Sequence, residues 1–141
     1  MSDRNEFLIC WGKSADGQLA TKICDDLQFV APQLVESPIK QKKIVCGEKH
    51  TATISIDGSA YSSGNNDFGQ LGRTGFQRQL EVISALETKF IVDIACGYNH
   101  TLLLDSDGMI YGFGDNSRGQ LGFDPKFETV PFPKRIVQSL S

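Results

Sequence analysis

Two cysteine–histidine pairs are the first residues in this 141-residue chain whose types and spacing could do chemistry. Cys46 stands four positions before His50, and Cys96 stands four positions before His100. Two thiolates and two imidazoles form a ligand set that structural zinc sites use. The pairs lie 50 residues apart in matching surroundings, however, so a repeated structural element explains them without a metal. We favour the structural interpretation and predict no metal site.

In the structural interpretation each residue of these pairs has a role in packing. We expect His50 and His100 to hydrogen-bond to backbone near the start of a strand, each fixing a tight turn. The cysteines would be small buried apolar residues. The chain has no third histidine to complete a Ser-His-Asp or Cys-His-Asn arrangement. The sequence therefore predicts no catalytic residue, no cofactor and no enzymatic activity.

Two glycine pairs copy the spacing of a phosphate-binding loop. They are Gly64 with Gly69, and Gly114 with Gly119. The residues that follow are Gln and Leu in both cases, where a P-loop needs Lys and then Ser or Thr. Because the phosphate-binding lysine and the magnesium-binding hydroxyl are missing, we interpret both segments as glycine-rich turns.

Two charged clusters have simpler explanations than ligand binding. Asp105, Asp107 and Gly108 match part of a calcium loop, but the first ligand position would be Leu103, which cannot coordinate the ion. A hairpin turn is the better interpretation. The basic run over residues 40–43 is typical of a solvated strand edge, and it is too short to predict nucleic-acid binding.

Composition and charge set broad limits on the function. The formal net charge is −3, which excludes a generally basic surface that coats nucleic acid. The apolar runs are too short to span a bilayer, and the first residues lack the pattern of a signal peptide. The four cysteines are therefore expected to be reduced. These features predict a cytoplasmic protein, with the nucleus as an alternative.

The strongest signal in the sequence is an internal repeat with a period of about 50 residues. Residues 44–72 align without a gap with residues 94–122, and a weaker copy lies upstream at an offset of 52. The recurring motif residues are Cys46, Gly47, His50, Asp57, Gly58, Gly64, Gly69, Gln70, Leu71 and Gly72, and then Cys96, Gly97, His100, Asp107, Gly108, Gly114, Gly119, Gln120, Leu121 and Gly122. Ile44, Thr51, Tyr61 and Asn66 also recur.

Within one period the local pattern is that of short strands. Apolar and β-branched runs alternate with turn residues, and an Asp-Gly pair between two such runs is a strong hairpin signal. We predict strands near 33–37, 43–46, 51–56 and 59–63 in one unit, and near 81–85, 91–96, 101–105 and 109–113 in the next. A four-stranded sheet repeated at this period is typical of a propeller blade.

The predicted fold class is all-β, a partial β-propeller with two complete four-stranded blades and one strand from each flanking blade. The whole of 1–141 is one incomplete propeller region. We divide it into 1–32, the end of a preceding repeat and its loop; 33–80 and 81–130, two full blades each with a following loop; and 131–141, the first strand of a next blade.

The ordered boxes Ile-x-Cys-Gly-x-x-His-Thr, Asp-Gly-x-x-Tyr and Gly-x-Asn-x-x-Gly-Gln-Leu-Gly resemble the repeats of the regulator of chromosome condensation family. That resemblance covers nearly the whole chain and implies blades of a seven-bladed β-propeller. The start of the chain, which reaches Cys10-Trp11-Gly12 almost at once, is similar to the amino-terminal propellers of HECT-type ubiquitin ligases. No HECT domain is present in this sequence, so ligase activity is not carried over.

The resemblance implies a non-catalytic protein-interaction module, a fragment or short form of a larger ubiquitin-pathway protein. The alternative is guanine-nucleotide exchange or binding toward a small Ran-like GTPase. Expected partners are other proteins, such as a GTPase or a ubiquitin-pathway component, without a membrane or nucleic acid. The candidate partner-binding loops precede the two Gln-Leu pairs and contain Asn65, Asn66, Asp67 and Phe68, and Asp115, Asn116, Ser117 and Arg118.

The length of the chain gives one further expectation. At a period near 50, even a four-bladed ring needs about 200 residues, so 141 residues cannot close a propeller. We expect the terminal blades to present apolar faces that pair with further blades, with self-association as one way to complete the ring.

Overall fold

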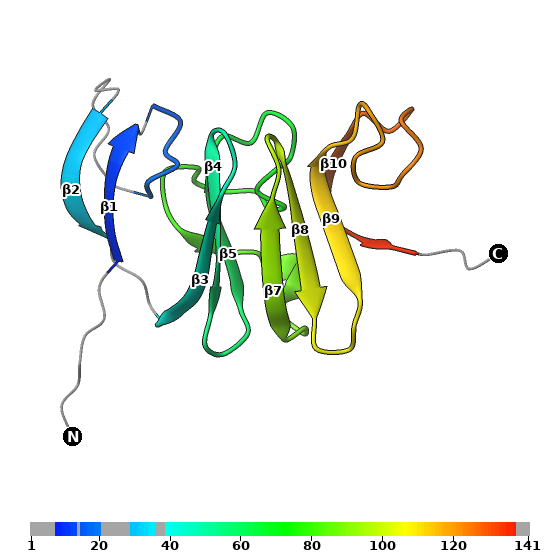
Figure 1. Ribbon diagram of the computed structural model, residues 1–141, viewed down its shortest axis with the longest axis horizontal. Coiled ribbons are helices and arrows are strands. Elements are labelled where there is room, and N and C mark those ends of the chain that lie inside the picture. The colour runs from blue at the N-terminus through cyan, green and yellow to red at the C-terminus, as the bar shows by residue number, and fades with distance from the viewer. Residues whose placement is uncertain (1–7, 14, 21–28, 36–38, 138–141) are drawn as a thin grey trace.

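The computed structural model describes residues 8–13, 15–20, 29–35 and 39–137, and it contains three antiparallel sheets that follow one another along the chain (Figure 1). The first sheet pairs β1 (Leu8–Lys13) with β2 (Phe29–Val35). The described residues include no helix long and apolar enough to cross a membrane. The predictions of an all-β fold and of two four-stranded blades of a partial propeller are confirmed.

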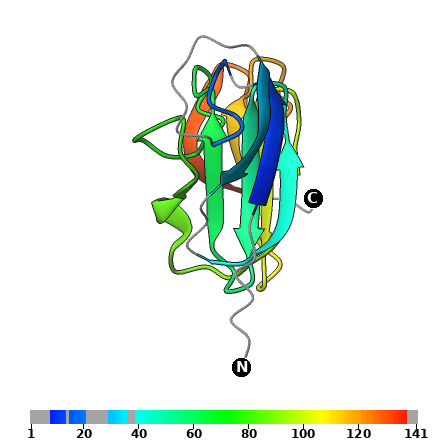
Figure 2. The ribbon, with the colours of Figure 1, turned by 90° about the vertical axis from the view of Figure 1, so that its left-hand side faces the viewer.

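The two four-stranded sheets repeat the same order. The second sheet runs β3 (Gln41–Cys46), β4 (His50–Ser55), β5 (Ala60–Gly64) and β6 (Glu81–Val82). The third sheet runs β7 (Ile91–Cys96), β8 (His100–Asp105), β9 (Ile110–Asp115) and β10 (Thr129–Ile136). The short 3-10 helix η1 (Ser84–Leu86) links β6 to β7. In the side view of Figure 2 the sheets lie one behind another along the line of sight.

The outer strand of each blade comes from a different place than the sequence predicted. The segment predicted near 81–85 and the strand predicted within 131–141, each as the first strand of a following blade, instead contribute to β6 and β10, which close the second and third sheets. Likewise β2, which covers most of the segment predicted near 33–37, pairs with β1 in the first sheet. An antiparallel strand needs only a loop to return beside the strand it has just left. The predicted divisions at residues 33, 81 and 131 are therefore each one strand too early.

Both predicted Asp-Gly hairpins are confirmed. Gly58 and Gly108 have φ values of +81° and +80°, which the hairpins require and a side chain would disfavour. The amide of Gly58 donates to the carbonyl of Ser55, and the amide of Gly108 donates to the carbonyl of Asp105. These hairpins join β4 to β5 and β8 to β9 with unbroken register.

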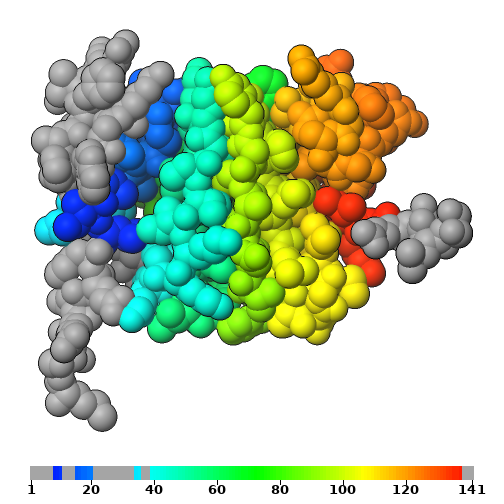
Figure 3. Space-filling model, viewed as in Figure 1, coloured from blue at the N-terminus to red at the C-terminus, as the bar shows by residue number. Residues whose placement is uncertain are grey.

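The inner edge of the blades is identified by contacts between equivalent residues of neighbouring sheets. Lys43 Nζ lies 2.5 Å from Asp93 Oδ1, and Tyr98 donates its hydroxyl proton to Glu48 Oε1 at 2.7 Å. Each pair is 50 residues apart, so each joins matching positions of two repeats. Blades that radiate from an axis are closest at the inner edge, so β3 and β7 are the inner strands. Figure 3 shows their two segments, cyan and yellow-green, touching along their length.

The described core lies between the second and third sheets. Its largest side chain is that of Phe113 of β9, which is fully buried. Aliphatic side chains from both sheets belong to the same cluster, and Leu121 comes from the loop after β9. The remaining members are Ala52, Ile54, Ala60, Ile83, Leu86, Ile91, Ile94, Leu103 and Val130. Burial of these faces against each other holds the two blades together.

Candidate functional site

The loops that carry the candidate partner-binding residues meet at one end of the blades. The amide of Asn65 donates to the carbonyl of Lys49 at 2.8 Å, and the amide of Asp115 donates to the carbonyl of Asn99 at 2.9 Å. The loops after β5 and β9 are thereby fixed beside the tight turns at 47–49 and 97–99, at the upper end in Figure 1. We call the exposed side chains of these four segments the loop-end surface: Glu48, Asp67, Phe68, Tyr98, Ser117 and Arg118.

The Gly-Gln-Leu-Gly boxes hold these loops in shape. Gly69 and Gly119 have positive φ values of +77° and +71°. The side-chain carbonyl of Gln70 accepts a hydrogen bond from the Phe68 amide at 2.9 Å, and Gln120 accepts one from the Arg118 amide at the same distance. The prediction of glycine-rich turns is confirmed for both boxes.

The structure divides each candidate loop into an inner and an outer part. Asn65 is buried, and its amide group bonds to Asp16 and Asp67. Asn66 and Asn116 each accept the amide of the leucine in the following box, at 3.0 and 3.1 Å. These asparagine side chains satisfy the backbone of their own loops.

The outer part of each loop is open to solvent. Asp67 and Phe68 are exposed in the first loop, and Ser117 and Arg118 are exposed in the second. Asp115 is half-buried, and its carboxylate accepts the Ser117 amide at 2.9 Å. Partner contact by these loops stays a prediction, and the outer residues are the ones whose side chains a partner can reach.

Sequence reasoning missed a strongly exposed aromatic residue at this end. Tyr98 is 67% exposed, although its hydroxyl is fixed on Glu48 and its carbonyl accepts the Glu48 amide at 3.0 Å. The hydrogen bond to the Glu48 carboxylate raises the pKa of Tyr98. The signal available was that this pair occupies a single repeat position and differs between the two copies. A position that varies inside a fixed motif is where a specific contact can be built.

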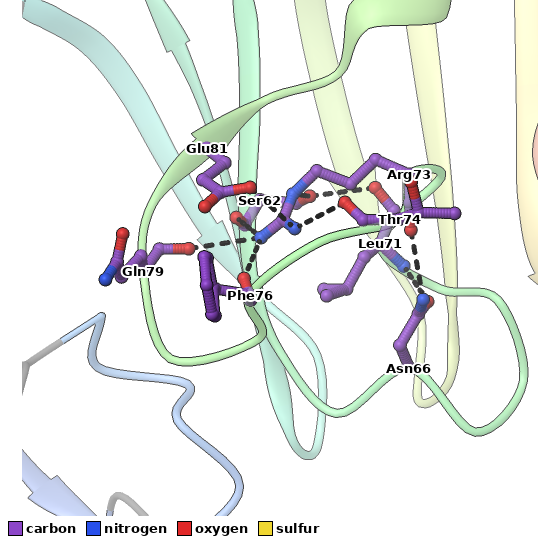
Figure 4. Close-up of polar contacts among 8 residues, drawn as sticks. All are labelled: Ser62, Asn66, Leu71, Arg73, Thr74, Phe76, Gln79 and Glu81. Carbon is purple, nitrogen blue, oxygen red and sulfur yellow. Dashed lines mark hydrogen bonds and ion pairs between the residues drawn. The ribbon is translucent and has the colours of Figure 1, made fainter. Parts of the chain in front are cut away.

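A buried arginine organises the loop between β5 and β6 (Figure 4). Arg73 donates to the Ser62 hydroxyl and carbonyl, and its Nη1 lies 3.4 Å from Glu81 Oε2. It also donates to the carbonyls of Thr74, Phe76 and Gln79. Burial lowers the pKa of the guanidinium, an effect that Glu81 opposes. The five N–H donors of an arginine suit this loop, which leaves several carbonyls without a strand partner.

The equivalent loop of the third sheet uses aromatic residues instead. Phe123 stands where Arg73 stands one period earlier. Lys134 Nζ of β10 lies 4.6 Å from the centre of the Phe123 ring and 5.1 Å from that of Phe127. Asn116 supplies the polar contacts by donating to the carbonyls of Phe123, Asp124 and Phe127. Two chemically different solutions therefore support the same loop-end surface.

His50 and Cys46 differ from the prediction. The Nε2 atom of His50 lies 2.9 Å from the hydroxyl of Thr101 in the next sheet, and the Thr101 hydroxyl donates to the Gln70 carbonyl at 3.0 Å. Because Thr101 has one hydroxyl proton, His50 must donate through Nε2, which leaves its buried Nδ1 without a partner. Burial, with a smaller effect of His100, lowers the pKa of His50 to about 4.

The prediction that His50 hydrogen-bonds to backbone is therefore wrong: the turn at 47–49 is closed by the Gly47 amide on the His50 carbonyl, and the side chain reaches the next blade. The prediction of buried cysteines is also wrong for Cys46, which is exposed, whereas Cys96 is half-buried and has its pKa raised to about 11 by burial. The part of the chain that the structure describes contains no group of three or more His, Cys, Asp or Glu side chains placed to hold a metal ion.

A row of four-stranded antiparallel sheets built from one repeated motif defines a β-propeller repeat protein. A sequence model of the "Regulator of chromosome condensation (RCC1) repeat" matches residues 7–54, 57–104 and 107–141, and a second model of the repeat matches residues 41–70 and 91–120. The chain therefore belongs to the regulator of chromosome condensation (RCC1) repeat family.

Curated relatives include large ubiquitin ligases. The chain is 35% identical over 89 residues to the "Probable E3 ubiquitin-protein ligase HERC4" of Rattus norvegicus, in a match that covers 62% of this chain and 8% of the relative. It is 42% identical over 66 residues to the "Protein RCC2 homolog" of Danio rerio, covering 45% of this chain and 13% of the relative. The chain thus spans a small fraction of the length of the curated relatives it matches.

Solved structures share the fold over almost the whole chain. A chain in the crystal structure of Kap60 bound to yeast RCC1 (Prp20) superimposes with a TM-score of 0.87 at 21% identity, over 96% of this chain and 34% of that one. Human WBSCR16 superimposes with a TM-score of 0.76 at 24% identity, over 96% of this chain and 36% of the other. At these identities the likeness shows the fold alone.

Proposed function

We propose that this chain is a non-catalytic protein-interaction module that binds its partner through the loop-end surface. The observation that carries the proposal is the exposed Tyr98, fixed by Glu48 beside the outer residues of two rigid loops. Tyrosine and arginine are enriched among residues that dominate binding energy, and a side chain that is already ordered loses less entropy on binding. Tyr98, Phe68 and Arg118 are the expected anchors.

The ubiquitin pathway is the setting we propose for this interaction. The support is the 35% identity to a relative named as a probable E3 ubiquitin-protein ligase. In that setting the module supplies recognition, and a catalytic domain elsewhere supplies ligation. The exposed side chains of the loop-end surface are suited to contact a protein surface. The glutamine and asparagine side chains of the same loops use their hydrogen bonds to fix the loop backbone.

The test is a quantitative affinity capture with three single variants, Tyr98→Ala, Phe68→Ala and Arg118→Ala. The matched control is Phe90→Ala, because Phe90 is 49% exposed and bonds through its carbonyl to Ser106, which adjoins the hairpin at the opposite end of the blades. We expect one set of partners to be lost with the loop-end variants and kept with the control. Circular dichroism confirms that each variant is folded.

Two outcomes would contradict the proposal. The first is a set of captured proteins that is the same for the wild type and all four variants. The second is faster nucleotide release from a Ran-type GTPase in the presence of the chain, because that result would show exchange activity in place of passive binding. Both assays use the same purified chain, so the two interpretations are separated directly.

A further inference from the structure

A cavity of about 200 Å³ lies between the first and second sheets, and it is partly open to solvent where Ile9, Ile44 and Cys46 are exposed. Apolar side chains make most of its wall, with Leu8, Leu19, Val35, Ile44 and Leu80 among them. We call the contact between these two sheets the first junction, and the contact between the second and third sheets the second junction. At the second junction the core side chains are closely packed.

The repeat explains why only one of the two junctions is filled. Phe113 is fully buried at the second junction, where its ring packs on Gly72 of the preceding blade. One period earlier the residue at the Phe113 position is Ser63, and Ser63 lines the cavity. A hydroxymethyl group at this position occupies much less volume than a benzyl group, so the space of a phenyl ring is left open.

The residue opposite changes together with it. Gly72 has a φ of +64°, and a Cβ atom built there would lie 2.8 Å from the Phe113 ring. The residue at the Gly72 position of the preceding repeat is Ala20, which also lines the cavity and has a φ of +54°. The repeat position that carries the ring beside Gly72 carries the smaller Ser63 here, which leaves room for the methyl group. Compared with the second junction, the first junction therefore lacks the phenyl ring and has only one additional methyl group.

We propose that the first junction is a binding site for a small molecule that carries one aromatic ring of about the size of benzene. An engineered apolar cavity of about 150 Å³ is large enough to bind benzene in another protein. The cavity here has a larger volume, is lined mainly by aliphatic side chains, and includes Ala20 and Ser63, whose repeat positions hold Gly72 and the Phe113 ring at the second junction. The Phe113 side chain at the second junction is thus an internal example of the ring that we expect the first junction to bind.

Two thiols on the wall provide a way to detect an occupant. Cys10 of β1 and Cys46 of β3 both line the cavity, and both are free thiols. Cys46 is exposed, so iodoacetamide can reach it, whereas burial raises the pKa of Cys10. A bound ring is expected to cover Cys46 and to slow its alkylation. Cys96 lies outside the cavity lining and serves as the internal reference.

The experiment is a titration of the full chain with benzene, followed by amide chemical shifts. We expect saturable shifts at Ala20, Cys46 and Ser63, and alkylation of Cys46 slowed about threefold or more while that of Cys96 is unchanged. The variant Ser63→Phe fills the cavity and should weaken binding about tenfold or more, which corresponds to about 1.4 kcal/mol. Ser63→Leu provides a smaller filling group in case the phenylalanine variant does not fold.

The matched control is Ser106→Phe, which makes the same substitution at an exposed position outside the cavity and away from the loop-end surface. It should bind benzene like the wild type. Shifts that do not saturate, shifts centred on the second junction, or equal binding by the Ser63→Phe or Ser63→Leu variant would each overturn the proposal. Partner capture by the loop-end surface does not depend on this cavity, so failure of one proposal leaves the other standing.

Discussion

The first and second junctions use the same polar contact and differ in how they fill the space around it. Thr51 donates to the Gln18 carbonyl at 2.7 Å across the first junction, and Thr101 donates to the Gln70 carbonyl at 3.0 Å across the second. The second junction adds a buried phenylalanine, whereas the first retains a cavity. The shared hydrogen bond therefore sets the register between neighbouring blades. The stabilisation from apolar packing differs from one junction to the next.

The largest expected effect comes from removing the ring that distinguishes the two junctions. Phe113→Ala should lower the free energy of unfolding by about 3–5 kcal/mol, because it opens a cavity in a closely packed core. Ser63→Ala, at the same repeat position of the first junction, should change it by less than about 1 kcal/mol, because no apolar contact of comparable size is lost. Urea unfolding curves measure both. Equal effects would mean that the junctions do not differ in packing.

The next effect is a dependence of stability on pH that arises at the second junction. The pKa of His50 is about 4 in the folded chain and near its ordinary value of 6.5 in the unfolded chain. The unfolded chain therefore takes up a proton first as the pH falls. The contribution is fully present above pH 6.5 and is lost between about pH 6.5 and 4, by about 3 kcal/mol.

The variant His50→Gln isolates this contribution. Its amide group can still donate to Thr101, but it does not titrate, so the difference in stability between wild type and variant should shrink as the pH falls from 6.5 to 4. His100 is less buried, and its pKa is also lowered by burial. His100→Gln is therefore the control, and it should keep most of the slope. Parallel stability curves for wild type and His50→Gln would refute the role given to His50.

A smaller effect separates backbone strain from contact with the ring. Gly72→Ala should destabilise the chain by about 1–2 kcal/mol, because φ is positive and the new methyl group meets the Phe113 ring. Gly122→Ala is the matched control: its φ is +79°, but the nearest atom to a new Cβ is 3.7 Å away. It should cost less than Gly72→Ala. A larger loss at Gly122 would show that strain, and not the ring, requires glycine here.

The smallest expected effect comes from a substitution at the first junction. Ala20→Gly should stabilise the first junction by up to about 1 kcal/mol, because it relieves the positive φ of a non-glycine residue. Ser63→Phe should be better tolerated in the Ala20→Gly background than alone, with a coupling energy of about 1 kcal/mol in a double-mutant cycle. Additive effects would mean that the two positions do not share the cavity.

Much of the local structure follows from the residues themselves. The Asp-Gly pairs predicted both hairpins, because a positive φ at Gly58 and Gly108 is strained for other residues. The Gly-Gln-Leu-Gly boxes predicted the loops that carry Phe68 and Arg118. The candidate site was harder to predict: the inward orientation of Asn66 and Asn116 depends on carbonyls that the loops bring close, and that of Asn65 on the Asp16 carboxylate. No local sequence pattern marks either arrangement.

The sequence by itself determined the repeat, the strands and the turns, because these depend on side-chain chemistry within a few residues of each other. The tertiary structure alone decided which sheet receives each outer strand, where His50 finds its partner, and which junction is filled. These features depend on pairs such as Ala20 with Ser63 and Gly72 with Phe113, whose members lie about 40 residues apart. Packing across such a separation becomes visible only when neighbouring blades are placed face to face.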